Sequence, residues 1–147
     1  MVRADGTPRL ELIFLYSASG GGCNGRWMMS DAIRWYDQNI SEVSRRYESV
    51  AANTVHGWLV DLLPIAPALV LDIGAGTGRD AAWLASRGLE VIAVEPSSAM
   101  RAEAQRLHPS PSIRWIPDSL PSLDQVLRLG LSFNLILLSA VILAWEP

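Results

Sequence analysis

The stretch Val70–Asp80, which reads VLDIGAGTGRD, decides the fold of this chain. An apolar run ends at Ile73, and glycines follow at Gly74, Gly76 and Gly78 before a helical pattern begins. Glycine is favoured where the backbone takes positive φ angles or where a ligand lies against it. The first turn of a helix also leaves backbone N–H groups without partners inside the helix. The stretch therefore predicts a buried strand, a tight turn and a helix, with a ligand site at the turn.

Strand and helix patterns alternate along the rest of the chain. Apolar strands are expected at residues 68–73, 90–95, 113–116 and 131–139, with helices at 77–87, 97–107 and 121–129. Such alternation indicates βαβ units and a parallel sheet. We therefore expect an α/β fold built on a Rossmann-like parallel sheet.

Two segments precede this α/β part. Residues 28–67 show helical patterning, with apolar side chains recurring at spacings of three and four, and end at two prolines. Residues 17–25 read SASGGGCNG, which is a flexible linker composition. We therefore expect a disordered extension or linker at 1–27, an N-terminal helical cap at 28–67 and the cofactor-binding half of a domain at 68–147.

The composition excludes several classes of function. The 147 residues make about one domain, half of them are hydrophobic, and the net charge of -3 argues against a nucleic-acid binder. All 12 basic residues are arginine, so chemistry that needs a lysine amine, such as a Schiff base, is excluded. The single cysteine, Cys23, allows neither an internal disulfide nor a multi-thiolate metal site. We expect a cytoplasmic protein with no metal, no nucleic-acid partner and no membrane span.

Two acidic residues beside the glycines indicate which cofactor binds. Glu95 closes the second strand 21 residues after Gly74, where a carboxylate can accept both hydroxyl protons of a ribose. Asp72 stands two residues before Gly74, where it would oppose the pyrophosphate of a dinucleotide but would suit the sulfonium and ammonium of S-adenosylmethionine. The spacing G-x-G-x-G also departs from the dinucleotide fingerprint G-x-G-x-x-G. A nicotinamide-dependent oxidoreductase stays the less favoured alternative.

Four stretches resemble, in order, the motifs of class I S-adenosylmethionine-dependent methyltransferases. They are VLDIGAGTGRDAAWLA (70–85), VIAVEPSSAM (91–100), IPDSLPSL (116–123) and FNLILLSAV (133–141). The sequence YDQN at 36–39, followed by RRY at 45–47, is similar to the N-terminal cap helix of small-molecule members. The family has a seven-stranded sheet of order 3-2-1-4-5-7-6. The resemblance implies that about four of the seven strands are present, in the order 3-2-1-4, and that the chain is C-terminally incomplete, with an open apolar edge at 135–138.

The glycine turn and the resemblance together nominate a set of cofactor-binding residues. They are Asp72, Gly74, Ala75, Gly76, Gly78, Glu95, Pro96, Asp118, Ser119, Ser139 and Tyr36. By the resemblance Asp118 would bond the adenine amino group, with Ser119 beside the ring, Ser139 near the methionine end and Tyr36 closing over the cofactor. Three alternatives stay open: Asp118 could instead begin a helix, Ser139 could be an ordinary small strand residue, and Tyr36 could be a core residue.

The expected activity is methyl transfer from S-adenosylmethionine to an acceptor by in-line displacement. A protein that does this must place the nucleophile in line and exclude water, and it needs no general base when the acceptor is an anion or a neutral amine. No catalytic residue is identified. The acidic charge and the helical cap favour a small-molecule acceptor. The alternative is a non-catalytic module that binds the cofactor, or a partner chain or second copy at the open sheet edge.

Overall fold

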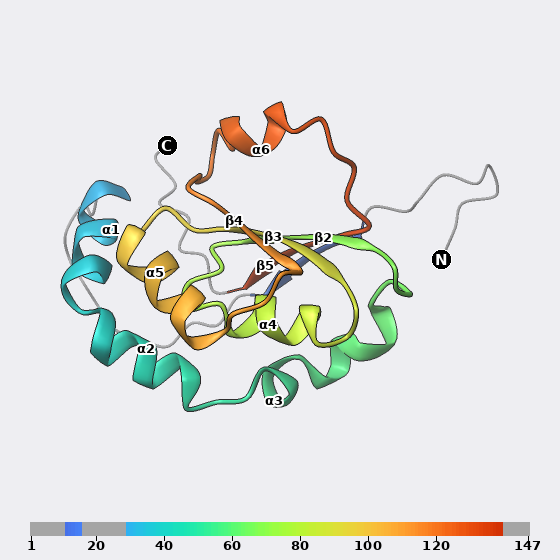
Figure 1. Cartoon of the computed structure of the whole chain (residues 1–147), viewed down its shortest axis with the longest axis horizontal. Coiled ribbons are helices and arrows are strands. Elements are labelled where there is room, and N and C mark those ends of the chain that lie inside the picture. The colour runs from blue at the N-terminus through green and yellow to red at the C-terminus, as the bar shows by residue number, and fades with distance from the viewer. Residues whose placement is uncertain (1–10, 16–28, 140–147) are drawn as a thin grey trace.

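The computed structural model describes residues 11–15 and 29–139. Within them a five-stranded parallel sheet forms the centre of the molecule (Figure 1). Its strands are β1 (Glu11–Leu15), β2 (Leu69–Ile73), β3 (Glu90–Val94), β4 (Ile113–Ile116) and β5 (Leu135–Ser139). The helices are α1 (Met29–Gln38), α2 (Ile40–Glu48), α3 (Ala52–His56), the 3-10 helix η1 (Gly57–Leu62), α4 (Arg79–Ala85), α5 (Ser98–Leu107) and α6 (Asp124–Arg128).

The strands lie in the order β1-β5-β2-β3-β4, and every neighbouring pair is parallel. Counted from β2 onward, the order β4-β3-β2-β5 is 3-2-1-4, so the expected Rossmann-like arrangement is confirmed. Helices α4, α5 and α6 connect successive strands, as parallel pairing requires. Because these strands are parallel, their carboxyl ends meet at one edge of the sheet, where ligands of open α/β sheets bind.

Strand β1 corrects the expectation for the start of the chain. Linker composition predicts disorder throughout 1–27, but residues 11–15 form β1, which pairs with β5 from Glu11↔Leu135 to Leu15↔Ser139. The edge expected to be open at 135–138 is therefore covered by the same chain. The physical reason is that an unpaired strand edge offers a row of backbone donors and acceptors that an apolar segment can satisfy. Residues 1–10 and 16–27 lie outside the described residues.

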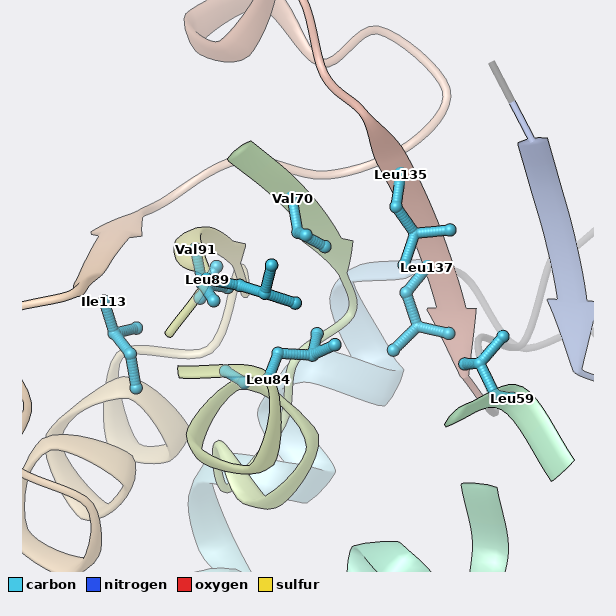
Figure 2. Packing of buried hydrophobic residues seen from close by; sticks show 10 residues of the cluster. Leu59, Val70, Leu84, Leu89, Val91, Ile113, Leu135 and Leu137 are labelled. Carbon is cyan, nitrogen blue, oxygen red and sulfur yellow. The ribbon is translucent and has the colours of Figure 1, made fainter. Parts of the chain in front are cut away.

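Side chains alternate between the two faces of the sheet, so each face has its own core. One core lies between the sheet, α4 and η1 (Figure 2), and consists of Leu59, Val70, Ala81, Leu84, Leu89, Val91, Ala93, Ile113, Leu135 and Leu137. The other consists of Leu71, Ile73, Ile92, Val94, Ile116, Val126, Phe133 and Leu138, and α6 contributes Val126 to it. Figure 1 shows α6 on the side of the sheet opposite α4. Burial on both faces explains why the sequences of β2, β3 and β5 are mostly apolar.

The N-terminal helices lie on the α4 side of the sheet (Figure 1). Helices α1 and α2 contact α5, and α3 contacts α4. The expected N-terminal helical cap is therefore present next to the helices that follow β2 and β3. Among the described residues, none of the helices combines the length and the apolar character that crossing a lipid bilayer demands.

Pairing of β1 with β5 gives a test of the sheet. N–H groups alternate in direction along a strand, so either Leu12 or Ile13 directs its N–H group at β5. Replacing both residues by proline removes that group, whichever of them carries it. The alternate amides of Leu135–Ser139 that bond to β1 should then exchange with solvent at least tenfold faster in hydrogen-exchange measurements. The double replacement by valine keeps the strand propensity and should leave exchange unchanged. Equal protection of β5 in both variants would contradict the pairing.

Candidate functional site

The glycine turn joins the end of β2 to the start of α4. The backbone N–H groups of Gly74 and Ala75 both donate to the carbonyl oxygen of Val94, at 2.8 and 2.9 Å, which fixes the turn to the end of β3. Gly74 and Gly76 have φ angles of +74° and +54°, which side chains disfavour. The turn therefore brings the carboxyl ends of two neighbouring strands into one rigid unit.

Gly78 is required by packing as well as by its backbone. Its φ angle is +82°, and a Cβ atom placed on it would lie 3.1 Å from Ala104 of α5 and 3.1 Å from the ring of Trp115 of β4. The lack of a side chain lets α4 begin close to α5 and β4. Of the predicted site residues, Gly78 thus has an evident structural role.

Glu95 stands directly after β3, and its carboxylate lies against the glycine turn. Its Oε2 accepts the N–H of Gly76 at 3.0 Å, and its Oε1 accepts the N–H of Ser97 at 2.9 Å. Burial raises the pKa of Glu95 above its ordinary value, although the bonds from Ser97 and Gly76 and the charge of Arg101 oppose the rise. The guanidinium of Arg101 donates to the carbonyl oxygens of Glu95 and Pro96, at 2.6 and 2.8 Å. The predicted ribose-binding acid is therefore held in place at the turn.

Asp72 is a buried carboxylate on β2 with an unsatisfied oxygen. Its side chain is 1% exposed, and its Oδ2 has no hydrogen-bond partner among the described residues. Burial raises the pKa of Asp72 well above its ordinary value, and the nearby carboxylates of Asp80 and Glu95 raise it further, against the charge of Arg79. A buried polar group without a partner is uncommon and needs a reason. A bound cation at the turn would supply one.

Asp80 joins the first turn of α4 to the N-terminal helices. Its Oδ1 accepts from Nε of Arg79 at 2.8 Å, and its Oδ2 lies 2.9 Å from Nε2 of the fully buried His56. Nη1 of Arg79 reaches on to the carbonyl oxygens of Tyr47 and Val50, at 3.2 and 3.3 Å. Burial alone would raise the pKa of Asp80, but the bonds from His56 and Arg79 lower it to about 2.

Two tyrosines from the N-terminal helices lie over the turn. A Cβ atom placed on Gly76 would lie 3.8 and 3.9 Å from two atoms of the Tyr47 ring. Tyr36 on α1 forms a hydrogen bond with Tyr47, and burial, Tyr47 and the charge of Glu95 together raise the pKa of Tyr36. The structure thus places the predicted Tyr36 near the turn and adds Tyr47, which sequence reasoning did not nominate.

Polar side chains fasten these helices to the rest of the site. The carboxylate of Asp37 on α1 accepts the hydroxyl of Ser97 and the N–H of Ala99, at the start of α5. On α2, Glu48 accepts the hydroxyl of Thr77 at 2.6 Å, and its other oxygen lies 3.1 Å from Nε2 of His108. The N-terminal helices therefore belong to the site.

Asp118 follows β4 and caps the next helix. Its Oδ2 accepts the N–H groups of Gln125 and Val126, at 2.7 and 3.0 Å, and its Oδ1 accepts the N–H of Ser119 at 2.9 Å. Asp118 thus caps α6 from six residues before its first residue, Asp124, and does not itself begin a helix, while adenine binding stays a prediction. Ser139 is the last described residue, at the carboxyl end of β5. Among the described residues no cluster of His, Cys, Asp and Glu side chains could hold a metal ion.

Comparison with known proteins agrees with this architecture. Residues 70–147, more than half of the chain, match the family model described as "Methyltransferase domain". The biotin biosynthesis bifunctional protein BioHC of Cellvibrio japonicus is 40% identical over 83 residues, which cover 54% of this chain and 16% of that protein. An uncharacterised methyltransferase of Staphylococcus carnosus is 39% identical over 69 residues, which cover 47% of this chain and 33% of that one. The crystal structure of a TehB-like SAM-dependent methyltransferase from Corynebacterium glutamicum superposes with a TM-score of 0.56 at 26% identity, covering 72% of this chain and 55% of that chain.

The chain belongs to the methyltransferase domain family. The resemblance to class I S-adenosylmethionine-dependent methyltransferases is confirmed, and S-adenosylmethionine is the cofactor of that family. The chain spans between about one sixth and about half of the length of the proteins just named.

The unsatisfied carboxylate gives a first test at the site. Because the folded state favours the protonated form of Asp72, its contribution to the free energy of unfolding falls as pH rises from about 4 towards the raised pKa. Replacement by asparagine removes this loss, so Asp72→Asn should stabilise the ligand-free protein at pH 7 by about 1 kcal/mol. Urea unfolding at pH 5 and pH 8 measures it, with Asp61→Asn, an exposed residue, as the control. Destabilisation at both pH values would contradict the charge argument.

The buried ion pair gives an opposite expectation for Asp80. Its pKa of about 2 means that the ionised form stabilises the fold above about pH 4, and this stabilisation is lost as pH falls from 4 to 2. Asp80→Ala should therefore cost about 3 kcal/mol at pH 7, because it leaves the buried His56 and the half-buried Arg79 without their carboxylate. Thermal unfolding at several pH values measures this cost, and the difference from the unaltered chain should shrink below pH 4. Asp61→Ala, at an exposed position, should cost less than about 0.5 kcal/mol; a cost as large as that of Asp80→Ala would contradict the role of the pair.

Proposed function

We propose that this chain is the cofactor-binding part of an S-adenosylmethionine-dependent methyltransferase that acts on a small molecule. The observation that carries the proposal is the carboxylate of Glu95, held 3.0 Å from the Gly76 amide, with the unsatisfied carboxylate of Asp72 on the neighbouring strand. A ribose acid and a buried carboxylate with an unpartnered oxygen at one glycine turn suit an adenosine that carries a cation.

The charge of the site separates this cofactor from a dinucleotide. Besides burial, the carboxylates of Asp80, on the first turn of α4, and Glu95 raise the pKa of Asp72, and burial raises the pKa of Glu95. Arg79, the basic group that moderates Asp72, is already bonded to Asp80 and to two carbonyl oxygens. A pyrophosphate at this turn would face net negative charge, whereas a sulfonium and an ammonium would be attracted. The structure therefore supports S-adenosylmethionine over a nicotinamide dinucleotide.

The residues present fit the cofactor in distinct roles. Gly74, Ala75, Gly76 and Gly78 would supply the close backbone surface, and Glu95 and Pro96 would hold the ribose. When bound, S-adenosylmethionine supplies a methyl group already activated by the positive charge of its sulfur. Asp118 and Ser119 would lie at the adenine end, provided that Asp118 accepts a further hydrogen bond while capping α6.

Ser139, at the end of β5, would bound the methionine end of the site, and Tyr36, on α1, would close over the cofactor. The contribution of the chain to methyl transfer would be to position the donor and to exclude water, rather than to move a proton.

Two features support a small-molecule acceptor: the net charge of the chain and the helices that lie over the turn. The net charge of -3 disfavours a nucleic acid, and the helices α1 and α2 lie over the turn and would narrow the access to it. The alternative of a binding module that docks a partner at an open β5 edge loses its basis, because β1 already pairs there.

Binding measurements test the proposal at Glu95. Isothermal titration calorimetry of the full chain should show S-adenosylmethionine binding and no comparable binding of NAD. Glu95→Ala should weaken that binding at least tenfold, because two charge-assisted hydrogen bonds to the ribose are lost. Glu95→Gln, which keeps the shape but removes the charge, should give a smaller loss.

The control is Glu90→Ala, an exposed carboxylate at the start of the same strand. It should leave the affinity unchanged. No binding of S-adenosylmethionine at millimolar concentration, or equal affinity for Glu95→Ala and the unaltered chain, would refute the proposal.

A further inference from the structure

Tyr47 on α2 places its aromatic ring against Gly76 in the middle of the glycine turn. Its ring is in van der Waals range of the position that a Cβ atom on Gly76 would occupy, at 3.8 and 3.9 Å. Gly76 has no side chain of its own, and its N–H is bonded to Glu95. The ring therefore lies beside Gly76, the same backbone position to which the Glu95 carboxylate is bonded.

The position of the ring is determined from several directions. The carbonyl oxygen of Tyr47 accepts from Arg79 at 3.2 Å, and Tyr36 forms a hydrogen bond with its phenol group. The next residue, Glu48, is bonded to the hydroxyl of the buried Thr77 within the turn. A side chain held by both its backbone and its neighbours has little freedom to move away when a ligand arrives.

The surroundings of the ring favour a positively charged ligand. Asp72 has an unpartnered oxygen and is 1% exposed, and Glu95 carries a second buried carboxylate at the same turn. The face of a tyrosine ring attracts cations through its quadrupole, and the attraction grows when water is excluded. A Tyr47 ring whose face meets the ligand would thus favour the same positive charge as the two carboxylates.

We propose that the ring of Tyr47 recognises the sulfonium of the cofactor and sets the preference of the site for S-adenosylmethionine over the neutral thioether product, S-adenosylhomocysteine. The inference rests on the proposed function, and it adds a residue that discriminates between the two. Donor and product differ by one methyl group and one positive charge, so contacts to adenine, ribose and carboxylate are common to both. A ring that attracts a cation acts on the difference alone and weakens the hold on the product after transfer.

The experiment compares affinities for the two compounds in variants at position 47. Calorimetry on the full chain should give a ratio of dissociation constants, product over donor, that falls about fivefold in Tyr47→Leu, with the loss confined to S-adenosylmethionine. Tyr47→Phe keeps the ring and should keep the ratio. Trp58→Leu, which removes an exposed aromatic side chain on η1, should change neither affinity.

A second series keeps the proposal testable should Tyr47→Leu fail to fold. Phenylalanine analogues with increasing numbers of ring fluorines at position 47 weaken the quadrupole at nearly constant size, and the affinity for S-adenosylmethionine should fall with each fluorine while that for S-adenosylhomocysteine stays level. An equal loss for both compounds would show that the ring only packs, and would overturn this inference alone. Absence of S-adenosylmethionine binding by the unaltered chain would overturn the proposed function together with it.

Discussion

The hydrogen bond from the Gly76 amide to the Glu95 carboxylate, 3.0 Å long, links the ends of two neighbouring strands. The paired bonds from Gly74 and Ala75 to Val94 reinforce the same junction on the backbone side. Every other part of the site is placed relative to this unit: α4 begins from it, α5 begins just beyond Glu95, and the N-terminal helices lie over it. The parallel sheet positions this unit, because the carboxyl ends of all its strands lie at one edge.

Placing buried carboxylates at one turn destabilises the ligand-free fold, and a bound cationic ligand would offset this cost. Asp72 and Glu95 are both buried and both have a raised pKa, and Asp72 lacks a partner for one oxygen. Asp80, two residues after Gly78, has the reverse behaviour because His56 and Arg79 hold it in its ionised form. Two acidic residues on the same segment therefore have opposite roles: one is a strain on the ligand-free fold, and the other fastens the N-terminal helices to it.

The sequence predicts the α/β part well because its signals are local. The glycines at 74, 76 and 78, the apolar strands and the serine cap at Ser97 each depend on residues a few positions apart. What escapes prediction is long-range. Tyr47, Glu48 and Asp37 reach the site across 29 to 62 positions, and their residue types carry no signal of it. Asp118 shows a further limit, since an acid before a helix has the same pattern whether it caps that helix or binds a ligand.

Strand β1 has a consequence for the order in which the chain can fold. Of the described strands it is synthesised first, yet its partner, β5, ends at Ser139, about 120 residues later. At roughly 5–20 residues per second, the ribosome needs on the order of ten seconds to deliver that partner. The contact also closes the longest loop of the described fold. The chain loses the conformational entropy of closing that loop before any stabilising bond forms. The segment synthesised first is thus the one that joins the sheet last, after the cofactor-binding strands have already come together.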